Sequence, residues 1–194
     1  MSRVIAMPFL MFAVSLPLLA QGRAGKYGVG VTYSSSASFI GSAQSFLISI
    51  RPNNTLILEP EIGLLRSAST YSTTGSTTNQ KSSDTRLGVG LLFRSAERDK
   101  LEPYVGPRVG IIRTSRENET TGSPKETTTQ SSWYFSAAAG AHYFFSRHFT
   151  VGGEVQFTKV GAGDQKRTPP DPAASNFKES ILGTAGVWVL RWYF

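Results

Sequence analysis

The sequence predicts an all-β fold, an eight-stranded antiparallel up-and-down transmembrane β-barrel. Three observations predict it: apolar and polar residues alternate with period two in eight segments, the connections between these segments are alternately short and long, and the apolar face carries aromatic residues towards both ends. The expected strands cover 26–36, 43–51, 55–70, 83–94, 101–116, 131–145, 149–160 and 180–194.

The connections separate the two rims of the expected barrel. Short turns follow the second, fourth and sixth strands, at 52–54, 95–100 and 146–148. Longer connections at 37–42, 71–82, 117–130 and 161–179 follow the other strands, and the last three are rich in threonine, serine, glycine, asparagine and proline. Short turns on the periplasmic rim and long loops on the extracellular rim are typical of outer-membrane barrels. Loops 71–82, 117–130 and 161–179 are therefore the segments expected to contact any extracellular ligand.

The two faces of each strand differ in polarity. In the strand over 149–160, Phe149, Val151 and Val155 alternate with Glu154 and Gln156. A membrane barrel turns the apolar row to lipid and encloses the polar row, whereas a soluble lipocalin-like barrel does the reverse. The polar row favours the membrane barrel, because it is rich in glycine and carries charges of both signs that can neutralise one another inside. The expected polar network of the lumen is Arg51, Glu59, Glu61, Arg86, Arg94, Glu102, Arg108, His142, Glu154 and Arg191.

Three prolines break the local rules for strands. Pro60, Pro103 and Pro107 fall inside expected strands, where each removes a hydrogen-bond donor from the ladder. Pro103 is near a strand start, where this costs little. Pro60 and Pro107 predict bulges, or strand boundaries that differ from those given above.

The first twenty residues have the pattern of a secretory signal peptide. Arg3 precedes an uncharged apolar run over 4–20, and Gln21 and Gly22 follow it. We expect 1–20 to be a cleaved signal peptide and 21–194 to be the barrel domain. Pro8 and Pro17 argue against a membrane-anchoring helix in this run.

The rest of the composition limits the chemistry. The chain has 194 residues, no cysteine and only two histidines, His142 and His148, so disulfides and thiolate metal sites are excluded. The net charge of +7 comes from scattered residues rather than a basic run, and it predicts no nucleic-acid partner. We expect no cofactor, no metal and no catalytic residue, because no phosphate-binding loop or metal-spaced cluster is present.

The end of the chain carries the most specific motif. In the segment 187–194, Trp188, Leu190, Trp192 and Phe194 share one face. With the strand motifs at 102–106 and 149–155, the segment 27–194 resembles the small outer-membrane β-barrel proteins of the OmpA, OmpX and opacity-protein type. The resemblance implies a bacterial outer-membrane location, contact with outer-membrane lipid, and an assembly signal in Trp188, Leu190, Trp192 and Phe194 that the outer-membrane assembly machinery reads.

Function is less well indicated than architecture. We expect a monomer with a structural or surface-interaction role and a salt-bridged lumen rather than an ion path, because an eight-stranded barrel is only wide enough for side chains. Two alternatives stay open, a lipid A-modifying outer-membrane enzyme and a soluble lipocalin-like ligand-binding barrel. A deacylase-like grouping of His148, Thr150 and Glu154 is disfavoured, because His148 lies in a turn while Glu154 is expected in the lumen.

Overall fold

A computed structural model describes residues 25–34, 44–95, 100–161, 163–170 and 180–194. The expected signal peptide, 1–20, lies outside the described residues, and so do the whole of the expected connection 37–42 and the segment 171–179. In the described part of the chain no helix is long and apolar enough to cross a membrane.

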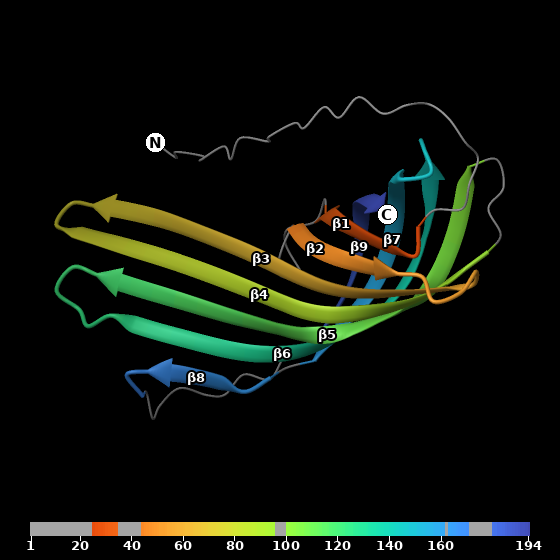
Figure 1. Ribbon diagram of the computed structural model, residues 1–194. Coiled ribbons are helices and arrows are strands. Elements are labelled where there is room, and N and C mark those ends of the chain that lie inside the picture. The colour runs from red at the N-terminus through yellow and green to blue at the C-terminus, as the bar shows by residue number, and fades with distance from the viewer. Residues whose placement is uncertain (1–24, 35–43, 96–99, 162, 171–179) are drawn as a thin grey trace.

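The described residues form one antiparallel sheet that closes into a barrel (Figure 1). Eight strands close it in the order β1-β2-β3-β4-β5-β6-β7-β9, with β9 returning to β1, and the short β8 pairs with β6 at the edge of the sheet. The predicted fold class is confirmed. The strands are β1 Tyr27–Ser34, β2 Gln44–Ile50, β3 Leu56–Thr73, β4 Ser76–Arg94, β5 Leu101–Thr120, β6 Glu126–Phe144, β7 Phe149–Gly161, β8 Gln165–Thr168 and β9 Ile181–Tyr193.

Four strands extend far beyond the barrel as a curved arm, to the left in Figure 1. The β3–β4 ladder is continuous from Leu56, opposite Phe93, to Thr73, opposite Ser76, and it ends in a tight turn with Gly75 at φ 87°. The β5–β6 hairpin continues in the same way, and β8 lies beside it. Hence the expectation of irregular loops at 71–82 and 117–130 is wrong, since both are mainly strand.

The physical reason is the composition of the arm. Serine and threonine fit a pleated sheet well, but here they occupy both faces, so the apolar–polar alternation that marks a strand in the sequence is missing. The expected loop 161–179 is only partly described, and it contains β8.

Apolar side chains cover the outside of the barrel. Val29, Ile48, Val105 and Ile111 are each about half exposed, whereas the charged residues on the opposite face are buried. This is the arrangement of a membrane barrel and the reverse of the soluble lipocalin-like alternative.

The interior is not purely polar. Three small apolar clusters lie among the charged groups of the described residues. One consists of Leu47, Val187 and Val189, one contains Ile57 and Leu92, and one contains Ile112 and Ala185. Narrow barrels are filled by side chains, and these residues occupy the volume that the ion pairs leave.

The strand prolines make no bulges. Pro60 lies where the β2–β3 pairing is interrupted, and Pro107 lies at a similar interruption of the β4–β5 pairing. In both ladders the register is the same on the two sides of the gap, whereas a bulge would shift it by one residue. Both prolines remain within their strands and keep a partner on the other side, so the expectation of bulges or misplaced boundaries is wrong.

Candidate functional site: a charged network along the lumen

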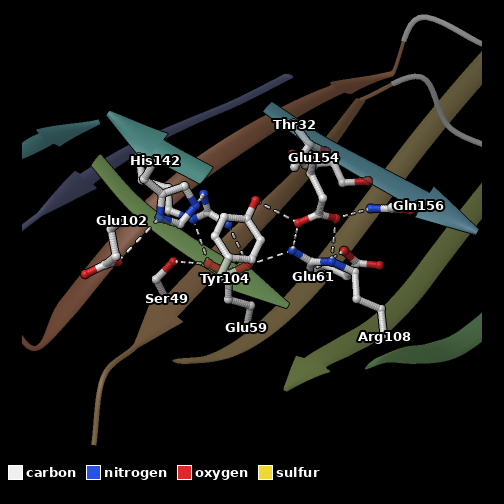
Figure 2. A network of polar contacts seen from close by, with 12 residues as sticks. Thr32, Ser49, Glu59, Glu61, Glu102, Tyr104, Arg108, His142, Glu154 and Gln156 are labelled. Atoms are coloured by element: carbon white, nitrogen blue, oxygen red, sulfur yellow. Dashed lines mark hydrogen bonds and ion pairs between the residues drawn. The ribbon is translucent and has the colours of Figure 1, made fainter. Parts of the chain in front are cut away.

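The alternation of strand side chains directs one row from each strand into the lumen. The ten residues expected there all have buried or largely buried side chains, and seven strands or their ends supply them. Figure 2 shows the middle of the resulting network of hydrogen bonds and ion pairs.

Arg108 on β5 lies at the centre of the network. Its Nε and Nη2 donate to Glu154 Oε1 and Oε2 on β7 at 2.9 and 2.8 Å. Nη2 also donates to Glu59 Oε2 at 2.9 Å, and Nη1 lies 3.5 Å from Glu61 Oε2. Three carboxylates from β3 and β7 therefore surround one guanidinium whose exposed fraction is 1%.

Glu59 connects this centre to Arg191 on β9. Arg191 Nε and Nη2 donate to the two Glu59 carboxylate oxygens at 2.6 and 2.8 Å, and Ser49 Oγ donates to Oε1 at 2.6 Å. Charge-assisted bonds in this two-pronged geometry fix orientation as well as charge. Arg191 Nη1 also contacts His142 Nε2, which leads the network towards the turn rim.

Glu102 is the centre of the network at the turn rim. Arg51 Nη2 donates to its Oε1 at 2.9 Å, Arg94 Nη1 donates to its Oε2, and His142 Nδ1 lies 3.7 Å from Oε1. The Arg51 guanidinium also lies 4.0 Å from the centre of the Tyr193 ring. At the other end, Glu61 accepts a hydrogen bond from Tyr134 and lies 2.9 Å from Arg86 Nη2.

Four neutral residues of the inward rows belong to the network, although the expected set contained only charged residues and one histidine. Tyr104 Oη donates to Glu154 Oε2 at 2.9 Å, and Gln156 Nε2 donates to Glu154 Oε1 at 2.5 Å. Ser49 and Tyr134 complete the environment of Glu59 and Glu61. The signal that could have found them is strand parity, because each stands on the inward row of its strand.

The arrangement neutralises charge. Five arginines, Arg51, Arg86, Arg94, Arg108 and Arg191, face four glutamates, Glu59, Glu61, Glu102 and Glu154. Buried charges are tolerated when they are paired and hydrogen bonded, so the network lets a polar row occupy a water-poor interior. In the described residues no group of three histidine or acidic side chains is arranged to hold a metal ion.

The residues of the deacylase-like grouping have separate partners. His148 Nδ1 lies 2.8 Å from the Tyr193 carbonyl oxygen, and its ring stacks on Trp192 at 5.9 Å between centres. Glu154 is bound to Arg108, and Thr150 is buried. The structure does not bring these three residues together as a catalytic site.

The proposed assembly residues lie on the outer face of the last strand. Trp188 and Leu190 are exposed on β9, Phe194 follows the strand and is also exposed, and Trp192 packs half-buried beside Phe149 with 6.3 Å between ring centres.

Two solved structures share the fold at low sequence identity. Neisserial surface protein A is 13% identical, with a TM-score of 0.54, and the match covers 87% of this chain and 96% of that one. A major outer membrane protein from Thermus thermophilus is also 13% identical, with a TM-score of 0.50, and the match covers 86% of this chain and 98% of that one. No curated protein matches the sequence significantly.

The family assignment comes from the sequence itself. Residues 8–180 match the family described as outer membrane protein beta-barrel domain, which is most of the chain. The closed barrel, its apolar outer face and its charged lumen agree with that match. The chain belongs to the outer membrane protein beta-barrel domain family, and it is a bacterial outer-membrane barrel.

Proposed function

We propose that the protein is a monomeric surface-interaction protein in which the barrel is an anchor and the arm is the interacting part. The observation that carries this proposal is the contrast between the two parts of the same strands. Within the apolar band, β3–β6 form part of the barrel wall around a lumen filled by ion pairs. Beyond the band, the same four strands continue as a polar sheet, which is not needed to anchor the protein in lipid.

The lumen supports an anchoring role rather than transport. Glu59, Arg108 and Arg191 are 0%, 1% and 1% exposed, and Glu59 accepts hydrogen bonds from both arginines. An ion that crossed the barrel would have to separate these pairs, and breaking a buried pair is costly. The network is therefore best explained as the packing that holds the barrel wall in shape.

The arm supports a role outside the membrane. Ile62 is in the last row of apolar residues that crosses the arm strands, and Thr73 lies eleven residues further along β3. At about 3.3 Å per residue, the hairpin extends about 36 Å past that row. Its residues are mostly serine, threonine, asparagine and glutamine, and β8 widens the sheet at one edge. A long, ordered, polar sheet offers a rigid surface for recognition.

We propose no catalytic role. His142 contacts Arg191 and lies near Glu102 inside the network, and His148 contacts a backbone carbonyl group at the turn rim. Within the part of the chain that is described, neither imidazole ring is hydrogen bonded to a serine or threonine hydroxyl that could act as a nucleophile. The backbone N–H of His148 donates to Ser146 Oγ at 3.2 Å, which does not activate that hydroxyl. Lipid A profiling with and without expression tests this point, and an altered acyl pattern would favour the enzyme alternative.

The proposal is tested by removing the arm and keeping the barrel. Residues 67–82 and 116–128 are each replaced by Asn-Gly, because Arg66 is opposite Ser83 and Ser115 is opposite Thr129, so a two-residue turn can close each hairpin. The shortened protein should still migrate faster before boiling than after it, as folded barrels do.

Binding is compared on immobilised extracellular-matrix proteins and polysaccharides, with cells that express either form. We expect the full-length protein to bind at least one of them and the shortened form to lose that binding. Equal binding by the two forms, or none by the full-length protein, contradicts a surface-interaction role for the arm.

A further inference from the structure

The outer face of β3–β6 changes from apolar to mainly polar within one step of the ladder. Ile62, Leu87, Ile111 and Trp133 lie opposite one another across the four strands, and each is between 42% and 55% exposed. They form the last apolar row that crosses the four strands before the arm. The boundary of the hydrocarbon layer on these four strands therefore lies near this row.

Basic residues occupy the two rows that follow. In the first, Arg113 lies opposite Thr85 and Ser131, and the half-exposed Leu64 on β3 lies on the other side of Thr85. In the second, Arg66 on β3 and Lys166 on β8 stand at the two ends of a row that Ser83, Ser115 and Thr129 complete. We call Arg66, Arg113 and Lys166, with these hydroxyl residues, the basic belt.

The three cations of the belt are exposed and available. Within the described residues, no ion pair or hydrogen bond involves the side chain of Arg66, Arg113 or Lys166. Neither of the two rows contains an acidic residue, and the next acidic residue on this face is Glu117, one row further out. The belt thus carries three cations with no acidic residue in their rows, unlike the lumen, where each guanidinium has a carboxylate partner.

The spacing suits a ligand with more than one anionic group. Arg66 and Arg113 are two strands and two residues apart, which corresponds to about 12 Å at ~4.8 Å per strand and ~3.3 Å per residue. Serine and threonine hydroxyls lie between the cations and can donate further hydrogen bonds. Arginine binds phosphate through two parallel bonds, which makes phosphate a better match than a neutral sugar.

We propose that the basic belt binds the phosphate groups of glycolipid headgroups in the outer leaflet. A lipid whose acyl chains contact Ile111 and Trp133 presents its headgroup at the level of Arg113 and Arg66, because these rows are successive on one face. A soluble polyanion would make no use of the apolar row beside the belt, whereas a lipid contacts both. This inference rests on the barrel and its outer face, and it does not depend on the proposed function of the arm.

The test measures lipid selectivity of the full-length chain refolded in detergent. Native mass spectrometry compares the retention of lipid A that carries two phosphates with that of the same lipid after its phosphates have been removed. We expect the wild type to retain the phosphorylated lipid at least about tenfold better. The variant Arg66→Gln/Arg113→Gln/Lys166→Gln should lose this preference while keeping its heat-dependent gel shift.

A matched control removes the same charge from the opposite rim. Lys26, Lys100 and Arg147 lie at the turn rim, and Lys26→Gln/Lys100→Gln/Arg147→Gln should keep the wild-type preference within about twofold. Retention of the preference in the belt variant overturns the proposal. So does an equal loss in both variants, because binding would then follow net charge instead of the belt.

Discussion

Arg108 on β5 and Glu154 on β7 form two parallel hydrogen bonds across the strand that separates them. Each is also bonded to further groups, Arg108 to Glu59 and Glu154 to Tyr104. The pair therefore ties together strands that share no backbone ladder. Ion pairs between strands that are not neighbours in the sheet resist flattening of the barrel. Backbone hydrogen bonds join only neighbouring strands and cannot have this effect.

The first prediction concerns the loss of this pair. Glu154→Gln keeps the side-chain volume but removes the charge that Arg108 faces, and we expect the free energy of unfolding to fall by about 3–5 kcal/mol, the usual cost of breaking a buried pair. Equilibrium urea unfolding in lipid vesicles, followed by tryptophan fluorescence, measures it. Glu126→Gln in the exposed arm is the control and should change stability by less than about 0.5 kcal/mol. A Glu154→Gln effect as small as that of the control would mean that the pair contributes little.

The second prediction concerns close packing inside the lumen. A Cβ atom at Gly88 would lie 1.9 Å from Tyr134 Oη and 3.0 Å from Glu61 Oε1, so Gly88→Ala must displace the tyrosine from its carboxylate partner. We expect a loss of about 1–3 kcal/mol in the same unfolding measurement. A Cβ at Gly153 meets nothing within 4 Å, so Gly153→Ala should leave stability unchanged or raise it slightly. Equal effects at the two glycines would contradict the assigned inward and outward faces.

The third prediction concerns the lipid-facing surface. Val89 points outward in the apolar band, opposite Val109 and Pro60. Val89→Arg should cost about 2–4 kcal/mol, as a charge near the membrane midplane does. Ser83 lies on the same face of the same strand, in the row of Arg66 beyond the apolar band. The variant Ser83→Arg should therefore fold as well as the wild type. The assay is the fraction of chain that shows a heat-dependent gel shift after refolding into vesicles. Similar losses for both variants would place the membrane boundary elsewhere.

The barrel could be predicted because its strands carry a strong contrast between two faces. In β7 the outward residues include Phe149, Val151 and Val155, and the inward residues include Glu154 and Gln156, so both the strand and its orientation can be read from parity. The closure of the barrel and the order of its strands could be predicted from the even number of strands and from the short turns between them. The arm could not be predicted in this way, because serine and threonine on both faces of β4 and β6 have no contrast to detect.

The site was only partly predictable for a related reason. Arg108 and Glu154 could be predicted as members of the network because they are charged residues on inward rows. Tyr104 is uncharged, and it belongs to the network only because its hydroxyl group donates a hydrogen bond to Glu154. Leu47 and Ile57 also lie inside, although an apolar residue at a strand position suggests a lipid-facing side chain. The partners within the network depend on the stagger between strands, which the pattern of a single strand does not contain.

The fourth prediction concerns ion flow. Because Glu59 joins Arg108 to Arg191 across the lumen, we expect the lumen to be closed, and the wild type in planar lipid bilayers should give no steady unitary conductance. Glu59→Ala/Arg108→Ala/Arg191→Ala removes these side chains and should give measurable current if it folds, which the gel shift verifies. Stable conductance by the wild type would favour an ion path over a structural network.

The fifth prediction concerns assembly of the barrel in cells. Trp188 and Leu190 lie on the outer face of β9, and Phe46 and Ile48 have similar exposure on the outer face of β2. A purely physical role predicts that Trp188→Ser/Leu190→Ser and Phe46→Ser/Ile48→Ser are equally harmful, because both remove comparable lipid-facing area. If the assembly machinery reads the β9 residues, the β9 variant should reach the outer membrane several-fold less than the β2 variant, while both refold equally well in detergent without the machinery. The measurement is the fraction of each variant that shows the heat-dependent gel shift, determined once in isolated outer membranes and once after refolding in detergent. Equal yields in the membrane would show that β9 contributes only its apolar surface.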